Sequence, residues 1–171
     1  MDLGEIKIRQ ELNYPEIEDA TECGRTVGVL KDLVSARGGE LNEVLQYVYQ
    51  STVADKSDAD LGQLFEEVGI VCMNHTGLLM HAITDFGGLP KYEDGNGYPF
   101  NMSCIKYTYK LKDMLDDNIV LTQNQIDNYK KAINMVSNVS LQKLFERIIK
   151  DKEVWLESLK TLRGTIKFLS V

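Results

Sequence analysis

The sequence predicts an all-α protein, folded as an antiparallel four-helix bundle with one long connection between the second and third helices. Four long stretches carry apolar residues at alternating steps of four and three, the pattern of helices packed about 20° from antiparallel. All three prolines (Pro15, Pro90 and Pro99) lie outside these stretches, so each stretch can be an uninterrupted helix. Short first and third connections and a long middle connection then give two helical hairpins joined by a crossover.

The first helix is predicted from Thr21 to Ala54. Its weak point is Gly38–Gly39, because each glycine costs a helix about 1 kcal/mol relative to alanine. The second helix is predicted from Ser57 to Phe86, where two glycines and then a proline follow and end it.

The third helix is predicted from Ser103 to Val136 and the fourth from Ser140 to Phe168. Between the second and third helices, the segment GGLPKYEDGNGYPFNM is rich in glycine and proline and forms the crossover. We assign residues 1–20 to an N-terminal arm and residues 21–171 to the bundle, which we expect to be one domain.

Composition restricts the class of partner. The chain has 171 residues and a net charge of −7, which argues against a large nucleic-acid interface or binding to anionic lipid. No stretch approaches 18 uninterrupted apolar residues, so we expect no membrane span. The three cysteines form no Cys-x-x-Cys pair, which favours a reducing cytoplasm over a disulfide framework.

Polar residues interrupt the apolar seam of each helix, where the seam is the row of residues that faces the bundle axis. Each interruption falls near the middle of its helix, and mid-helix positions of an antiparallel bundle lie at similar heights. We therefore expect these residues to meet in one layer. They are Glu40, Cys72, His75, Thr122, Lys152 and Trp155.

Each of these residues also has a purely structural interpretation. A single seam histidine is more often a hydrogen-bonded core residue than a ligand, and a buried cysteine behaves as a small apolar residue. Lys152 is harder to explain in this way, because a buried ammonium is costly unless it is paired. Glu40 is the expected partner of Lys152, at little or no net gain in stability.

Several stretches resemble ferritin-like proteins of the rubrerythrin and manganese-catalase type. In that family the four helices give a Glu, a Glu-x-x-His, a Glu and a second Glu-x-x-His, which together hold two iron or manganese ions. The resemblance covers roughly residues 24–162. It is carried by GGELNEVLQYVYQ, FEEVGIVCMNH, NIVLTQNQIDNYKKAINM and LQKLFERIIKDKEVW.

The resemblance implies that only two of the six ligands remain. Glu40 matches the first Glu and His75 the first His. The other four ligand positions hold Cys72, Thr122, Lys152 and Trp155. The resemblance thus implies a degenerate two-metal site in which Lys152 takes the place of a cation and Trp155 fills vacated volume.

Three functional hypotheses follow. The first is a non-catalytic structural or assembly subunit without a cofactor. Its partner would be a second copy, a larger homo-oligomer, a metal-bearing paralogue or a spore layer, in the cytoplasm or associated with the spore. The second is an oxidoreductase that holds one iron, manganese or zinc ion at Glu40, Cys72 and His75. The third is a sensor whose Cys72 thiol has a pKa lowered by Lys152.

Overall fold

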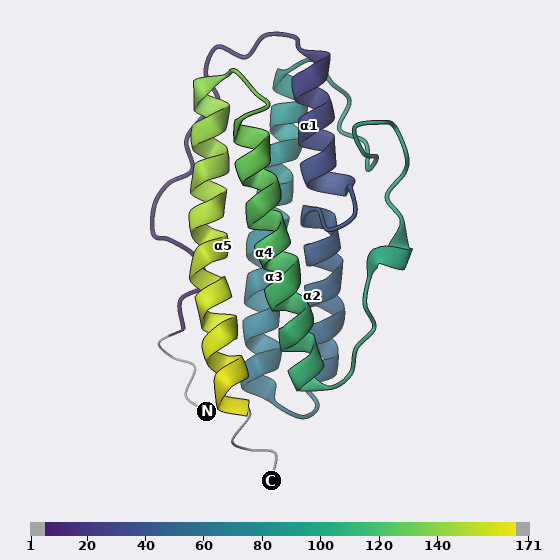
Figure 1. Ribbon diagram of the computed structural model, residues 1–171, viewed down its shortest axis with the longest axis vertical. Coiled ribbons are helices and arrows are strands. Elements are labelled where there is room, and N and C mark those ends of the chain that lie inside the picture. Colours follow the sequence, from purple (N-terminus) through teal and green to yellow (C-terminus); the bar gives the residue numbers. More distant parts are fainter. Residues whose placement is uncertain (1–5, 167–171) are drawn as a thin grey trace.

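The computed structural model describes residues 6–166, and the predicted end of the fourth helix at Phe168 lies outside them. This part of the chain is all-helical and forms a four-helix bundle, so the predicted fold class is confirmed (Figure 1). No helix in this part is both long enough and apolar enough to span a membrane. The elements are α1 (Gly24–Ser35), α2 (Glu40–Ala54), α3 (Ala59–Asp85), the 3₁₀ helix η1 (Met102–Cys104), α4 (Leu111–Ile133) and α5 (Val139–Ile166).

The predicted first helix is divided in two. Ala36 is extended with ψ 164°, and Gly38 has a left-handed backbone with φ 79°, so α1 ends and α2 begins anew at Glu40. A β-carbon on Gly39 would lie 2.7 Å from the carbonyl oxygen of Val34, so only glycine fits at this close approach of the two helices. The predicted weak point is therefore a complete break, although α1 and α2 share one position in the bundle (Figure 1).

The third helix begins later than the sequence analysis placed it. Residues 102–104 form η1, residues 105–109 have no helical structure, and α4 starts at Leu111 rather than at Ser103. The β-branched and aromatic residues of the IKYTY segment at 105–109 favour an extended backbone over a helix. The crossover runs along α1 and α2: the Gly95 N–H donates to Asp32 Oδ1 at 2.7 Å, and Gln46 bonds both backbone groups of Lys106.

The N-terminal segment lies along α5 without regular secondary structure (Figure 1). The Ser158 hydroxyl donates to the Lys7 carbonyl at 3.0 Å, and the Ser140 hydroxyl donates to the Glu18 carbonyl at 3.1 Å. Ile6, Ile8, Tyr14 and Ile17 pack against the apolar core. The segment therefore covers one side of the bundle.

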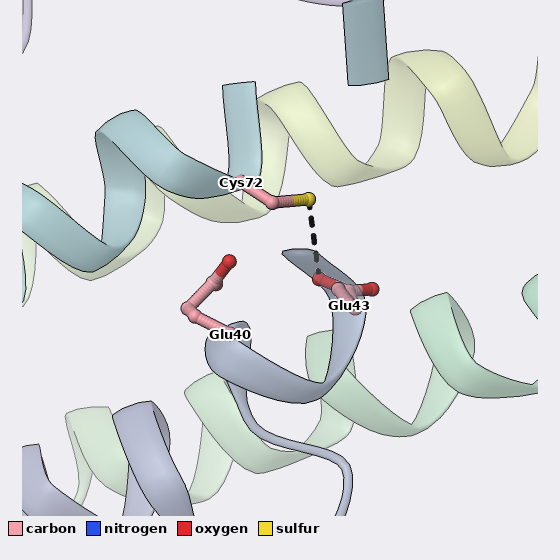
Figure 2. A group of neighbouring side chains, drawn as sticks. All are labelled: Glu40, Glu43 and Cys72. Carbon is pink, nitrogen blue, oxygen red and sulfur yellow. Dashed lines mark hydrogen bonds between the residues drawn. The ribbon is translucent and has the colours of Figure 1, made fainter. Parts of the chain in front are cut away.

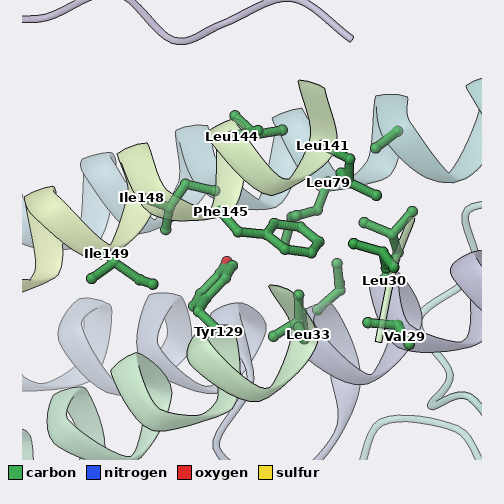
Figure 3. Packing of buried hydrophobic residues seen from close by; sticks show 14 of the residues in the cluster. Val29, Leu30, Leu33, Leu79, Tyr129, Leu141, Leu144, Phe145, Ile148 and Ile149 are labelled. Atoms are coloured by element: carbon green, nitrogen blue, oxygen red, sulfur yellow. The ribbon is translucent and has the colours of Figure 1, made fainter. Parts of the chain in front are cut away.

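The apolar core consists of two clusters, one toward each end of the bundle. One cluster joins α1, the end of α3, the end of α4 and the start of α5, and includes Tyr129 and Phe145, whose ring centroids lie 5.6 Å apart (Figure 3). The other joins α2, the start of α3, the start of α4 and the end of α5. Buried polar side chains gather between the two clusters, at the middle of the bundle.

Candidate metal centre

All six residues that the sequence analysis placed in a polar layer are completely buried. Glu40, Cys72, His75, Thr122, Lys152 and Trp155 each have a relative exposure of 0%. α2 contributes Glu40, α3 contributes Cys72 and His75, α4 contributes Thr122, and α5 contributes Lys152 and Trp155.

Lys152 forms the centre of the layer. Its Nζ lies 2.9 Å from Glu40 Oε1, as the sequence analysis predicted, and it also donates a hydrogen bond to Glu43 Oε2. Burial by itself would lower the pKa of Lys152, but the two carboxylates outweigh burial and raise this pKa above its ordinary value. Lys152 is therefore an ammonium held between two glutamates.

The two glutamates differ in their electrostatic environment. Burial would raise the pKa of Glu40, but Lys152, His75 and a 2.6 Å hydrogen bond from the Tyr129 hydroxyl lower it to about 2. For Glu43, burial dominates, and together with the nearby charge of Glu40 it raises the pKa despite the contact with Lys152. Glu40 is thus the carboxylate that balances the charge of Lys152.

Glu43 was not identified from the sequence, although it lies one helical turn after Glu40. Figure 2 shows Glu40 and Glu43 on α2 directed toward Cys72 on α3. The Cys72 thiol donates to Glu43 Oε2 at 3.6 Å and the Thr122 hydroxyl donates to Glu43 Oε1 at 3.4 Å. The Trp155 Nε1–H in turn donates to Thr122 Oγ1 at 3.1 Å. The substituted ligand positions therefore form a hydrogen-bonded chain that ends at Glu43.

The environment of Cys72 argues against an activated thiol. Burial, and then the neighbouring Glu43, raise the pKa of Cys72 well above its ordinary value, and Lys152 only partly opposes them. Since the thiolate is the reactive form, the hypothesis that Lys152 activates this cysteine is not supported.

His75 faces a second group of residues that the sequence analysis did not include. Its Nε2 lies 3.1 Å from Asp151 Oδ2 and 3.1 Å from the Tyr14 hydroxyl, while Nδ1 lies 3.7 Å from Glu40 Oε2. Burial would lower the pKa of His75, but Asp151 and Glu40 outweigh burial and raise it. A carboxylate on each side therefore favours the imidazolium form.

Asp151 connects this histidine to the N-terminal segment. It accepts hydrogen bonds from the Tyr14 hydroxyl at 2.7 Å, the Gln10 N–H at 2.7 Å and Arg147 Nη1 at 2.5 Å. Burial would raise its pKa, but the bonds from His75, Tyr14 and Arg147 lower it to about 2. Asp151 lies off the seam and the N-terminal segment has no apolar periodicity. The sequence pattern therefore did not predict that the two contact each other.

A two-metal centre does not fit this arrangement. Among the described residues, Glu40, Glu43 and Cys72 are the one group whose ligand atoms all lie within 4.8 Å of one another, and this group does not contain His75. Lys152 Nζ already contacts both of its carboxylates, so a cation there would meet a fixed positive charge and would have to displace it. Trp155 and the Lys152 ammonium provide no ligand for a second ion, and the Thr122 hydroxyl is already hydrogen-bonded to Trp155 and Glu43.

No family model and no curated protein matches the chain. Two crystal structures of KatB, a manganese catalase from Anabaena, are similar to it with TM-scores of 0.83 and 0.84 at 14% identity. They cover 93% and 95% of this chain and 80% and 81% of KatB. A bacterioferritin from Desulfovibrio desulfuricans, which has a diiron site, is similar with a TM-score of 0.73 at 20% identity, over 84% of this chain and 81% of that chain. The protein therefore has the ferritin-like fold.

Proposed function

We propose that this chain is a non-catalytic ferritin-like protein that acts as a structural or assembly subunit and binds no metal cofactor. The supporting observation is the Lys152 ammonium, which is completely buried and contacts both Glu40 and Glu43. A bound cation at the same place would need these carboxylates for itself. The ammonium thus supplies internally the positive charge that the buried carboxylates require.

The side chains of the layer fill its volume as well as balance its charge. Trp155 has a relative exposure of 0% and stacks on His75 with ring centroids 6.0 Å apart. Its Nε1–H is satisfied by Thr122 at 3.1 Å, so the large ring occupies the interior without an unpaired donor. A packed, charge-balanced layer suits a scaffold better than a centre that must admit substrate.

The surface of α2 and α3 supports self-association. Val48, Ile70 and Met73 are 52%, 50% and 53% exposed, and Ile70 and Met73 lie one turn apart on α3. We propose a homodimer or larger homo-oligomer, with a metal-bearing paralogue or a spore layer as the other assembly partners. Size-exclusion chromatography with light scattering tests self-association, and a monomer at all accessible concentrations would contradict it.

The compartment that we propose is the cytoplasm, or a spore layer assembled from it. All three cysteines are free, and free thiols persist where the compartment is reducing. The net charge of −7 disfavours nucleic acid and anionic membrane as partners.

Metal analysis tests the absence of a cofactor. The full chain is purified after growth with added iron, manganese and zinc, and the metal content per chain is measured by mass spectrometry. We expect no stoichiometric metal in the wild type. Two metal ions per chain would refute the proposal.

A single-metal oxidoreductase is the alternative, and the proximity of Glu40, Glu43 and Cys72 favours it. Thiolate and carboxylate can hold zinc or iron, with His75 as the further ligand expected from the sequence. This alternative requires one metal ion per chain that is lost in Cys72→Ser and retained in Cys104→Ser, which changes a cysteine outside the layer.

A further inference from the structure

A groove lies between the end of α2 and the first half of α3. Its volume is about 800 Å³, and residues of both helices line it. Asp55, Glu66 and Glu67 provide three carboxylates to the lining, whereas Lys56 provides one ammonium. Ile70, which belongs to the exposed apolar surface described above, also lies in the lining. We call this feature the acidic groove.

The carboxylates of the acidic groove are available to a partner. Asp55 and Glu66 are exposed, and neither forms an ion pair with another residue between positions 6 and 166. Glu67 accepts a hydrogen bond from the neutral amide of Gln63 at 2.9 Å, which leaves its charge uncompensated. The groove therefore favours a partner that brings positive charge.

The end of the crossover and the first turn of α4 carry the opposite charge. Residues 106–112, KYTYKLK, contain three lysines and no acidic residue, in a chain whose net charge is −7. Lys106 pairs with Asp117. Lys110 and Lys112 are exposed, and they form no ion pair within the described part of the chain. We call this stretch the basic segment.

Two tyrosines of the basic segment are exposed to solvent. Tyr107 and Tyr109 have relative exposures of 61% and 75%. The ring of Tyr107 packs against Tyr49 of α2, with ring centroids 5.0 Å apart, so the segment is held beside this helix. Exposed tyrosines in such a position suit a protein interface, where aromatic residues are enriched and contribute much of the binding energy.

The acidic groove and the basic segment lie on opposite sides of α2. Successive residues of a helix are about 100° apart around its axis, so Ser51 and Tyr49 project on opposite sides of Val48. Ser51 lines the acidic groove, and Tyr49 contacts the basic segment. Figure 1 likewise shows α3 on one side of α2 and the crossover on the other. Val48, which is 52% exposed, therefore lies between the two charged surfaces.

We propose that this face of α2 is a two-fold interface, in which the basic segment of each copy lies along the acidic groove of the other. The proposal rests on the self-association proposed above and assigns the surfaces that produce it. A two-fold axis parallel to α2 places each side of this helix against the opposite side of its partner, so both charged contacts form together. Val48 of each copy then lies at the centre of the interface. Lys110 and Lys112 pair with the carboxylates of the partner's groove.

A second copy is the partner that the charges favour. Each chain carries both complementary surfaces on one face, so a two-fold dimer covers the groove and the segment at once. A basic protein of another kind would neutralise the groove but would leave the basic segment without a partner.

Exchanging the charges tests the pairing. The segment variant is Lys110→Glu with Lys112→Glu, and the groove variant is Asp55→Lys with Glu66→Lys. Each variant alone brings like charges together at both contacts, so we expect its self-association to weaken by about tenfold or more in sedimentation equilibrium. A mixture of the two variants restores opposite charges at both contacts. We therefore expect mixed dimers with an affinity close to that of the wild type, which native mass spectrometry detects when one variant carries an affinity tag.

Both variants should fold, because two of the changes suit the helix ends. Lys112 lies in the first turn of α4 and Asp55 is the C-cap of α2, and the helix dipole favours a negative charge at the former and a positive charge at the latter. Circular dichroism checks the fold. Lys143→Glu with Lys150→Glu is the control, since it changes two exposed lysines of α5 and alters the net charge as much as the segment variant does. We expect the control to associate like the wild type.

The proposed interface is overturned if the wild type self-associates and the segment and groove variants do so equally well. It is also overturned if the mixture of the two variants forms no mixed dimer. Either result leaves the proposed self-association standing and moves it to another face of the bundle. A wild type that stays monomeric contradicts the self-association as well.

Discussion

Replacing Lys152 by methionine tests whether this side chain is the internal cation of the layer. Methionine has a similar length and no charge, so it removes the ammonium and retains most of the packing volume. Glu40 and Glu43 would then remain completely buried without the cation that now contacts both. We expect a large loss of folding stability at neutral pH.

The magnitude follows from the environment of Glu40. Its pKa falls from 4.5 to about 2 in the folded protein, and a difference of this size corresponds to about 3 kcal/mol. Removing one partner of a buried ion pair costs about 3–5 kcal/mol in general. The variant keeps His75, which lies 3.7 Å from Glu40 in the wild type, so we expect a loss near the lower limit of that range at pH 7, about 3 kcal/mol.

The loss should depend on pH in a defined direction. In the wild type the pKa of Glu40 is lowered, so its contribution is present above pH 4.5 and is lost as the pH falls toward about 2. In Lys152→Met, burial without the ammonium raises the pKa of both carboxyl groups, so the variant gains stability as they become protonated. The stability difference between wild type and variant should therefore shrink as the pH is lowered from 7 to about 4.

Urea unfolding measures the effect, and Trp155, the one tryptophan of the chain, provides the fluorescence signal from within the layer. Lys160→Met removes an exposed lysine of α5 that pairs with Glu157, and no measurable change is expected there. Adding Glu43→Gln to Lys152→Met should recover part of the loss, because one unpaired carboxyl group is removed. A loss below about 1 kcal/mol at pH 7, or a loss independent of pH, would refute the role assigned to Lys152.

Three further predictions concern the arm, the helix break and the buried thiol. Tyr14→Phe removes the hydroxyl that donates to Asp151 at 2.7 Å, and it should lower the free energy of unfolding by about 1–3 kcal/mol. Urea titration measures this free energy, and an unchanged value would argue against the contact. Gly39→Ala should destabilise the protein, because the new β-carbon would lie 2.7 and 2.9 Å from carbonyl oxygens of α1. Gly24→Ala is the matched control, since no atom lies within 4 Å of a β-carbon there. Equal urea midpoints for the two variants would contradict the close approach at Gly39. Cys72 should react with a thiol reagent only as fast as the protein unfolds, because its side chain is buried and its pKa is raised. Labelling of the native protein at the rate of a free thiol would show that the layer is open.

The bundle could be predicted because the apolar seam repeats along each predicted helix. Alternating steps of four and three placed Phe65, Val68 and Leu79 in the core, and all three have a relative exposure of 0%. The same reasoning located the polar layer, since a charged residue such as Lys152 on an otherwise apolar seam has to find a partner inside. A regular pattern makes each exception to it informative.

Other parts of the site could not be read in this way. Glu43 and Asp151 lie beside the seam, where a carboxylate is ordinarily assigned to solvent, but both are completely buried. Glu43 is buried by the packing of neighbouring helices, whereas the N-terminal segment also covers Asp151. Tyr14 belongs to a segment without periodicity, so its contact with His75 depends on the path of the chain outside the bundle. The start of α4 was predicted too early, because the spacing of seam residues does not show that residues 105–109 favour an extended backbone.

The contact between the N-terminal segment and α5 has a consequence for the order of folding. The backbone of Gln10 and the side chain of Asp151 are joined across 141 positions of sequence, and Tyr14 reaches the same carboxylate across 137. During synthesis the segment leaves the ribosome before the helix that receives it. His75 and Asp151 therefore stay without their contacts to the segment until α5 has emerged and the segment docks on it.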